Sequence, residues 1–104
     1  VLQHYTEEHQ SSGLLYITRI PSIGLKERQE IIVKMAQTGI ATNVHYKPLP
    51  MMTAYKNLGF NIGNFPNAYK QFENEITLPL HTKLMDEEVE YVREKYCEIV
   101  KAYV

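Results

Sequence analysis

Hydrophobic and polar residues follow two different periods along this chain, and the changes of period predict strands and helices. Residues 14–20 are rich in Leu, Ile and Tyr and stop at a proline, which predicts a strand buried on much of both faces. Residues 40–45 alternate with a period of two, which predicts a half-buried strand. Residues 76–78 are a short apolar segment before Pro79, and they predict a third strand.

Apolar residues at helical spacing predict helices between these strands. The clearest helix covers residues 86 to about 103, with Val, Ile and Tyr on one stripe and acidic residues in the first turn. Residues 26–38 predict a second helix, with Arg28 on the solvent side and Gly39 at the helix end. A short helix is expected at residues 52–58, and another from Pro66 to about residue 74.

The order of these elements predicts a fold class. Strand, helix, strand, short helices, strand and long helix favour a two-layer α/β sandwich of the α+β type. We expect a small, mostly antiparallel sheet of about three strands with helices on one face. Residues 1–13 are polar and end in Ser-Ser-Gly, so they are interpreted as a linker or loop before a domain at residues 14–104.

Composition excludes several classes of function. A length of 104 residues with 44% hydrophobic residues suits one small domain. The net charge of −1 comes from mixed charges, so no nucleic-acid surface is expected, and no apolar run is long enough to span a membrane. The single cysteine, Cys97, fits a reducing compartment, so we expect a cytoplasmic protein with Cys97 buried or half-buried in the last helix. The four histidines lack metal-ligand spacing, so no metal site is expected.

The residues after the second predicted strand form the candidate ligand site. His45 and Tyr46 lie where this strand meets a loop that is stiffened by Pro48. Histidine can exchange protons near neutral pH, and tyrosine offers a hydroxyl and an aromatic face. A purely structural role for His45 stays open at this point. His81 follows the third strand, and it either joins the same site or is an exposed loop residue.

Longer strings in the sequence carry a family resemblance. Residues 11–16 read SSGLLY, residues 39–49 read GIATNVHYKPL, and FPNA at 65–68 is followed about ten residues later by LPL at 78–80. In this order and register, the strings resemble the C-terminal small domain of DegT/DnrJ/StrS-type sugar aminotransferases, which are fold-type-I enzymes that depend on pyridoxal phosphate. The sequence departs from the family pattern at Leu14, Pro50 and Met85.

The resemblance implies a specific activity for the full-length protein. Such enzymes move an amino group, usually from glutamate, to a keto carbon of a nucleotide-linked sugar, with pyridoxal phosphate as the electron sink. The lysine that binds this cofactor lies in the large upstream domain of the family. We therefore expect no catalytic, cofactor-binding or metal-binding residue in this chain, and no activity of the chain alone. The resemblance also implies a homodimer for the full-length enzyme.

The same resemblance assigns substrate-facing positions, and they are His45, Tyr46, Lys47 and Pro48. Two other hypotheses stay open from the sequence. The chain could be a free-standing α/β module that binds a ligand or regulates a partner, or a structural domain that only supports another domain.

Overall fold

A two-stranded antiparallel sheet lies at the centre of the computed structural model, which describes residue 2 and residues 5–104. Strand β1 (Tyr16–Arg19) pairs with β2 (Glu75–Leu78), and the register runs from Tyr16 opposite Leu78 to Arg19 opposite Glu75. Together with the helices, this sheet confirms the predicted α/β class, although the sheet has two strands where about three were expected.

The prediction of a strand at residues 40–45 is wrong, because this segment pairs with the sheet at one position only. Asn43 and Thr77 exchange both backbone hydrogen bonds, at N···O distances of 3.1 and 2.8 Å. Beyond Asn43 the backbone donors are taken by side chains. The amide oxygen of Asn43 accepts from the N–H of Val44 at 2.8 Å, and the carboxylate of Glu75 accepts from the N–H of His45 at 3.0 Å. Side chains thus compete with the sheet for these N–H groups.

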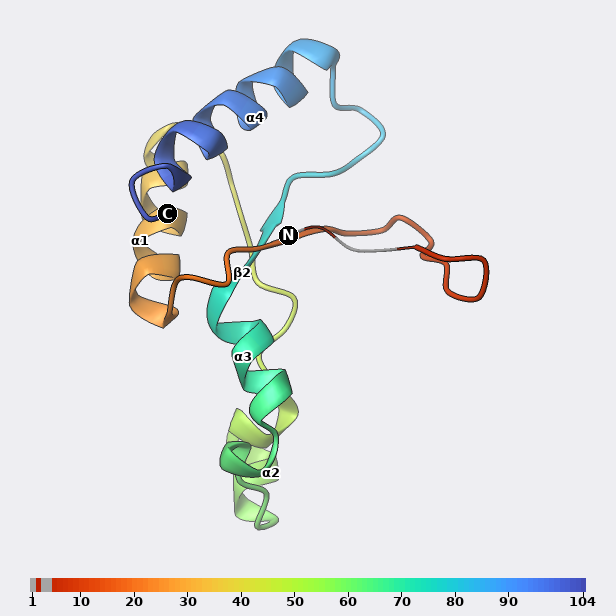
Figure 1. The fold of residues 1–104 in the computed structure, drawn as a ribbon, viewed down its shortest axis with the longest axis vertical. Helices are drawn as coiled ribbons and strands as arrows, with labels where there is room; N and C mark the ends of the chain where they lie inside the picture. Colours follow the sequence, from red (N-terminus) through yellow and green to blue (C-terminus); the bar gives the residue numbers. More distant parts are fainter. Residues whose placement is uncertain (1, 3–4) are drawn as a thin grey trace.

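The four predicted helices are confirmed. Helices α1 (Leu25–Gln37) and α4 (Asp86–Val100) contact each other beside the sheet, as Figure 1 shows. Helices α2 (Thr53–Asn57) and α3 (Pro66–Asn74), with the 3-10 turns η1 (Leu49–Met51) and η2 (Ile62–Asn64), extend away from the sheet on the side opposite α4 (Figure 1). Gly39 follows α1 with a φ of 82°, which glycine adopts without a Cβ clash.

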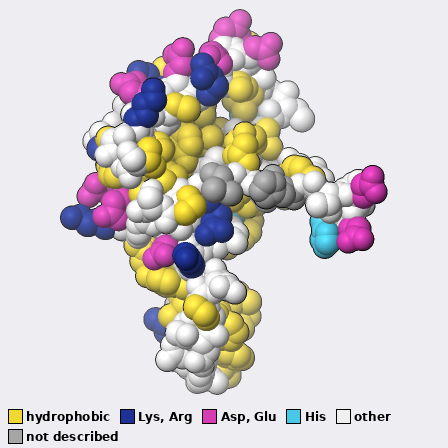
Figure 2. Space-filling view, viewed as in Figure 1, with side chains coloured by type: hydrophobic (Ala, Val, Ile, Leu, Met, Phe, Trp, Pro, Cys, Tyr) yellow, Lys and Arg dark blue, Asp and Glu magenta, His cyan; other side chains and the backbone are white. Residues whose placement is uncertain are grey.

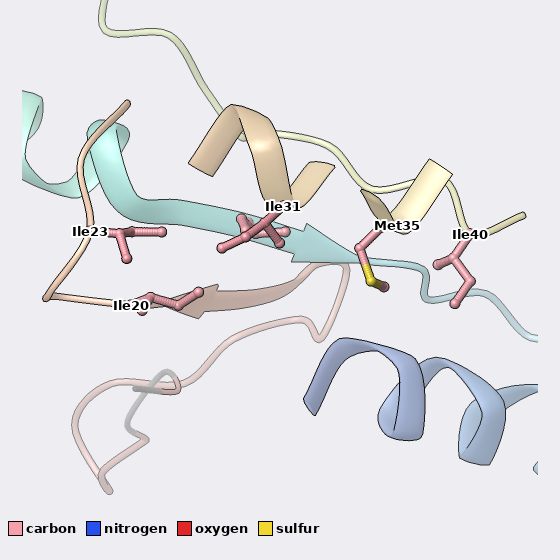
Figure 3. Close-up of a cluster of buried hydrophobic side chains, with 6 residues drawn as sticks. Ile20, Ile23, Ile31, Met35 and Ile40 are labelled. Atoms are coloured by element: carbon pink, nitrogen blue, oxygen red, sulfur yellow. The ribbon is translucent and has the colours of Figure 1, made fainter. Parts of the chain in front are cut away.

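The hydrophobic core lies between α1 and the sheet (Figure 3). Ile31 and Met35 of α1 and Ile76 of β2 have no exposed surface. The loops around these elements contribute further buried side chains, which are Ile20, Ile23 and Ile40. Each of these apolar residues removes hydrocarbon surface from water, and this burial is the main favourable contribution to folding.

Helix α4 packs on this core with one half-buried face and is attached by tyrosine hydroxyls. The hydroxyl of Tyr91 donates to the carbonyl oxygen of Thr38 at 2.9 Å, and the hydroxyls of Tyr96 and Thr18 lie 2.6 Å apart. Burial raises the pKa of Tyr96, and the hydrogen bond to Thr18 opposes this shift less strongly. Tyr96 is therefore a neutral phenol that links α4 to β1.

Two side chains have a different environment from the one that the sequence predicts. Arg28, expected on the solvent side of α1, is 7% exposed because its guanidinium lies against α3. It donates to the carbonyl oxygen of Phe72 at 2.5 Å and lies 4.6 Å from the centroid of the Phe72 ring. Cys97, expected to be buried or half-buried, is exposed, because it lies beside the half-buried stripe of α4.

Candidate functional site

The candidate site is built on the polar face of β2. Neighbouring residues of a strand point to opposite faces, so Glu75 and Thr77 share one face while Ile76 points into the core. Glu75 is 1% exposed and Thr77 is 5% exposed. Buried polar side chains of this kind need hydrogen-bond partners. These partners come from the segment that the Asn43–Thr77 bridge holds beside the strand.

His45 is the residue that this polar face positions. Its backbone N–H donates to Oε2 of Glu75 at 3.0 Å, and its ring Nδ1 lies 3.0 Å from Oγ1 of Thr77. The hydroxyl of Thr77 in turn donates to Oε1 of Glu75 at 2.5 Å. The backbone and the ring of His45 are therefore both held by one buried network, even though these partners are about 30 residues away in the sequence.

A second charge lies near this network. The guanidinium of Arg28 interacts electrostatically with Glu75, and the carboxylate opposes the lowering of the pKa of Arg28 that burial causes. A buried carboxylate is costly unless it has donors or a nearby cation. Glu75 has two donors, from His45 and Thr77, and Arg28 as the nearby cation.

A cavity of about 310 Å³ opens beside His45. Apolar side chains form most of its wall, and the polar residues along it are Thr42, Asn43, His45 and Thr77. The hydroxyl of Thr42 is buried and has no hydrogen-bond partner among the described residues. An apolar cavity with a few convergent polar groups is typical of a small-molecule site.

The structure does not place the other predicted substrate-facing residues in the wall of this cavity. Tyr46 is 71% exposed, and its ring meets that of His45 edge-on at a centroid distance of 4.7 Å. Lys47 is exposed, and Pro48 is half-buried at the start of η1. These three residues follow His45 in the sequence, and their contact with a ligand stays a prediction.

His81 does not join His45. It is exposed in the loop before α4, where its ring Nδ1 accepts a hydrogen bond from the N–H of Lys83 at 3.3 Å. It is absent from the described wall of the cavity beside His45. Of the two interpretations that the sequence left open, the structure favours an exposed loop histidine.

Glu75 and Thr77 are the site residues that the sequence analysis missed. A signal for them was present, because the string Glu-Ile-Thr-Leu at residues 75–78 alternates polar and apolar side chains. Starting the strand at residue 76 placed Glu75 outside it. Once the strand begins at Glu75, the alternation puts both polar side chains on the same face.

A larger, apolar cavity of about 390 Å³ lies between α4 and the opposite face of the sheet. Hydrophobic side chains gather there in Figure 2. Its wall includes Tyr16, Leu78, Val92 and Cys97. None of the predicted substrate-facing residues lies among the described residues of this wall. The two cavities share Leu78, Pro79 and Leu80 in their walls, but of the two only the one beside His45 is lined by His45 and Thr77.

The sequence profile of the DegT/DnrJ/EryC1/StrS aminotransferase family matches residues 1–96. This match covers the sheet, the loop with His45 and most of α4. The chain belongs to the DegT/DnrJ/EryC1/StrS aminotransferase family. The resemblance that the motifs predict is thereby confirmed.

Solved structures of aminotransferases have the same fold. The chain superposes on the PLP form of the sugar aminotransferase Spr1654 from Streptococcus pneumoniae with a TM-score of 0.92, at 57% identity over 99% of this chain and 26% of that one. For the aminotransferase TlmJ from Streptoalloteichus hindustanus the TM-score is 0.79, at 28% identity over 95% of this chain and 25% of that one.

Curated relatives are similar at lower identity. The pleiotropic regulatory protein of Geobacillus stearothermophilus is 31% identical over 88% of this chain and 25% of its own length. The spore coat polysaccharide biosynthesis protein SpsC of Bacillus subtilis is 29% identical over 84% of this chain and 23% of its own length. The chain thus spans about a quarter of the length of these relatives.

The cavity beside His45 does not fit pyridoxal phosphate on its own. This cofactor is held as a Schiff base by a lysine amine. The wall of the cavity beside His45, as far as the structure describes it, contains no lysine. Lys34 and Lys95 instead contact Tyr103 and Glu98 on the surface. We therefore assign no step of the aminotransferase reaction to a cofactor held in this cavity.

Within residue 2 and residues 5–104, no group of three or more His, Cys, Asp or Glu side chains is arranged to hold a metal ion. No helix in the same residues has the length and apolar character needed to cross a membrane.

Proposed function

We propose that this chain is the C-terminal small domain of a pyridoxal-phosphate-dependent aminotransferase that acts on a nucleotide-linked keto sugar, and that it forms one wall of the substrate pocket. The amino group comes from an amino-acid donor, which we propose to be glutamate. In this proposal residues 1–13 connect to a large domain that carries the cofactor lysine, and residues 14–104 form the small domain. The enzyme works as a homodimer in the cytoplasm, and the chain alone has no activity.

The observation that carries this proposal is the position of His45. A buried network of Thr77 and Glu75 holds both the ring and the backbone of this histidine at the wall of the cavity. The family match supports the reaction class, and the similarity to Spr1654 supports a sugar substrate. The ring of His45 lines a cavity of about 310 Å³, and this position supports a contact with a ligand.

Kinetics of a protein of family length that contains this chain test the proposal. We expect His45→Ala to lower kcat/KM for the keto sugar by about 10- to 100-fold, the loss expected when one or two transition-state hydrogen bonds of about 1.4 kcal/mol each are removed. Tyr46→Phe is expected to have a smaller effect, because it removes only the hydroxyl of an exposed ring. The half-reaction with glutamate is measured separately, so that sugar contacts and donor contacts are distinguished.

His81→Ala is the matched control, because it removes the same imidazole from an exposed loop outside the cavity wall. It is expected to leave kcat/KM within about twofold of the unmodified enzyme. Equal kcat/KM for His45→Ala and the unmodified enzyme contradicts the proposal and favours a domain that only supports its partner. Calorimetry of the 104-residue chain with UDP-glucose and with glutamate tests the remaining alternative, since saturable binding is expected only of a free-standing module.

A further inference from the structure

The proton on the ring of His45 can be located by counting the hydrogen-bond donors in its network. The Thr77 side chain has one hydroxyl proton, and it points to Oε1 of Glu75 across 2.5 Å. The same Oγ1 lies 3.0 Å from Nδ1 of His45. Because the only proton of Thr77 is already donated, the contact with Nδ1 is a hydrogen bond only if Nδ1 carries the proton.

The direction of this network depends on Glu75 acting as an acceptor at both oxygens. Its Oε2 accepts from the backbone N–H of His45 at 3.0 Å, so this oxygen is an acceptor in the network. The positive charge of Arg28 lies close enough to interact with this carboxylate. Arg19 lies opposite Glu75 in the sheet register, so its side chain projects from the same face of the sheet. Both side-chain oxygens of Glu75 therefore act as acceptors, one from the N–H of His45 and one from the hydroxyl of Thr77, and the network contains no donor bond from Glu75 to Thr77.

The other ring nitrogen, Nε2, is then the free one. In a neutral imidazole one nitrogen is the donor and the other is the acceptor. None of the described residues forms a hydrogen bond with Nε2 of His45. The side chain lines the cavity of about 310 Å³, so a ligand in that cavity can meet a nitrogen lone pair.

We infer that Thr77 and Glu75 are positioning residues that hold neutral His45 as its Nδ1–H tautomer, so that Nε2 is a hydrogen-bond acceptor for a sugar hydroxyl in the cavity. The identity of this ligand rests on the proposed function. A neutral hydroxyl fits better than an ammonium group, because no acidic side chain lies among the described residues of the cavity wall. The apolar side chains beside His45 and the unpartnered hydroxyl of Thr42 suit a sugar ring with several hydroxyls.

Nitrogen NMR of the 104-residue chain with ¹⁵N-labelled histidine tests the tautomer directly, at a pH where the imidazoles are neutral. The pattern of two-bond proton–nitrogen couplings distinguishes Nδ1–H from Nε2–H. His81 is the internal control, because its Nδ1 accepts from the N–H of Lys83 and it must therefore be the Nε2–H tautomer. We expect opposite tautomers for the two residues. An Nε2–H pattern for His45 overturns the inference.

Variants of Thr77 separate the network from general packing. Thr77→Ser keeps the hydroxyl, and it is expected to keep the Nδ1–H pattern of His45. Thr77→Val has the same shape without the hydroxyl, and it is expected to shift His45 toward the Nε2–H form that free imidazole side chains prefer. Identical His45 spectra for the two variants contradict the positioning role. The comparison of His45 with His81 needs no variant, so the test stands even where Thr77→Val does not fold.

Deoxy sugars test the ligand class in the protein of family length. The probes are UDP-glucose or dTDP-glucose, whichever binds, and the derivatives that lack the hydroxyl at carbon 2, 3 or 4. One derivative is expected to bind about tenfold more weakly, the effect of one hydrogen bond, and this difference is expected to disappear in His45→Ala. A tenfold difference that persists in His45→Ala contradicts the hydroxyl contact. If neither nucleotide sugar binds while the NMR result holds, the proposed function fails and the tautomer assignment stands.

Discussion

Replacing Arg28 by methionine removes a buried cation while keeping most of the side-chain length. Arg28 is 7% exposed and joins α1 to α3 through its hydrogen bond to the carbonyl oxygen of Phe72. Its guanidinium also lies 4.6 Å from the centroid of the Phe72 ring. After the substitution this carbonyl loses its charged donor, and Glu75 loses a nearby positive charge.

The expected loss of stability follows from these contacts. A hydrogen bond to a charged group contributes about 1.5–3 kcal/mol, and a desolvated cation over an aromatic ring contributes up to about 2 kcal/mol. Removal of one member of a buried charged set costs about 3–5 kcal/mol. We therefore expect Arg28→Met to lower the free energy of unfolding by about 3–5 kcal/mol. In a domain of this length, that loss lowers the Tm by about 12 °C or more.

Urea unfolding followed by circular dichroism measures this loss. Lys26→Met is the matched control, because it makes a similar change in chemistry at an exposed position in the first turn of the same helix. It is expected to change the free energy of unfolding by no more than about 0.5 kcal/mol. In a Glu75→Gln background the cost of Arg28→Met is expected to fall, because the carboxylate no longer needs a cation. Equal effects of Arg28→Met and Lys26→Met refute this account of the buried cation.

The remaining predictions concern the core and α4, and urea unfolding measures each of them. Ile31→Ala is expected to cost about 2–5 kcal/mol because Ile31 has no exposed surface, whereas Val33→Ala on the same helix, at 47% exposure, is expected to cost less than about 0.5 kcal/mol. Met85→Ser is expected to stabilise the chain by about 0.5–1 kcal/mol, because Met85 is the N-cap of α4 and makes no side-chain capping bond; no gain would contradict the assignment of the cap. Tyr96→Phe is expected to cost about 0.5–1.5 kcal/mol by removing the hydrogen bond to Thr18. Because the pKa of Tyr96 is raised in the folded chain, the contribution of this phenol to the free energy of unfolding is complete below pH about 10 and falls as the pH rises further. Tyr96→Phe is expected to lessen this loss of stability at alkaline pH.

Local sequence patterns predicted most of the secondary structure. Helix α3 has the predicted boundaries, and α1 is displaced from its predicted range by one residue at each end. These elements follow from local signals, namely the proline that opens α3, the glycine that follows α1 and the spacing of apolar residues. The strand at residues 40–45 failed for a non-local reason. Its N–H group at His45 donates to Glu75, which lies 30 residues further along the chain.

The candidate site was predicted only in part, for the same reason. His45 was singled out because of its place in a family motif and at the start of a proline-stiffened loop. Its partners Thr77 and Glu75 come from β2. The short alternation of polar and apolar residues in β2 does not show that the polar face of this strand will meet His45. Arg28 illustrates the limit in a different way. Helical spacing placed it on the solvent side, and only the docking of α3 buries it against Phe72.

The sequence by itself determined the fold class, the helices and the membership of the aminotransferase family. These properties follow from periodicity, turn residues and motif strings that are complete within a few tens of residues. The tertiary structure alone decided that Thr77 and Glu75 hold His45 and that Nε2 of this histidine is free beside a cavity. The physical reason is that the direction of a hydrogen bond depends on the full set of donors and acceptors at one place. That set is assembled only when the sheet register brings distant residues within about 3 Å of one another.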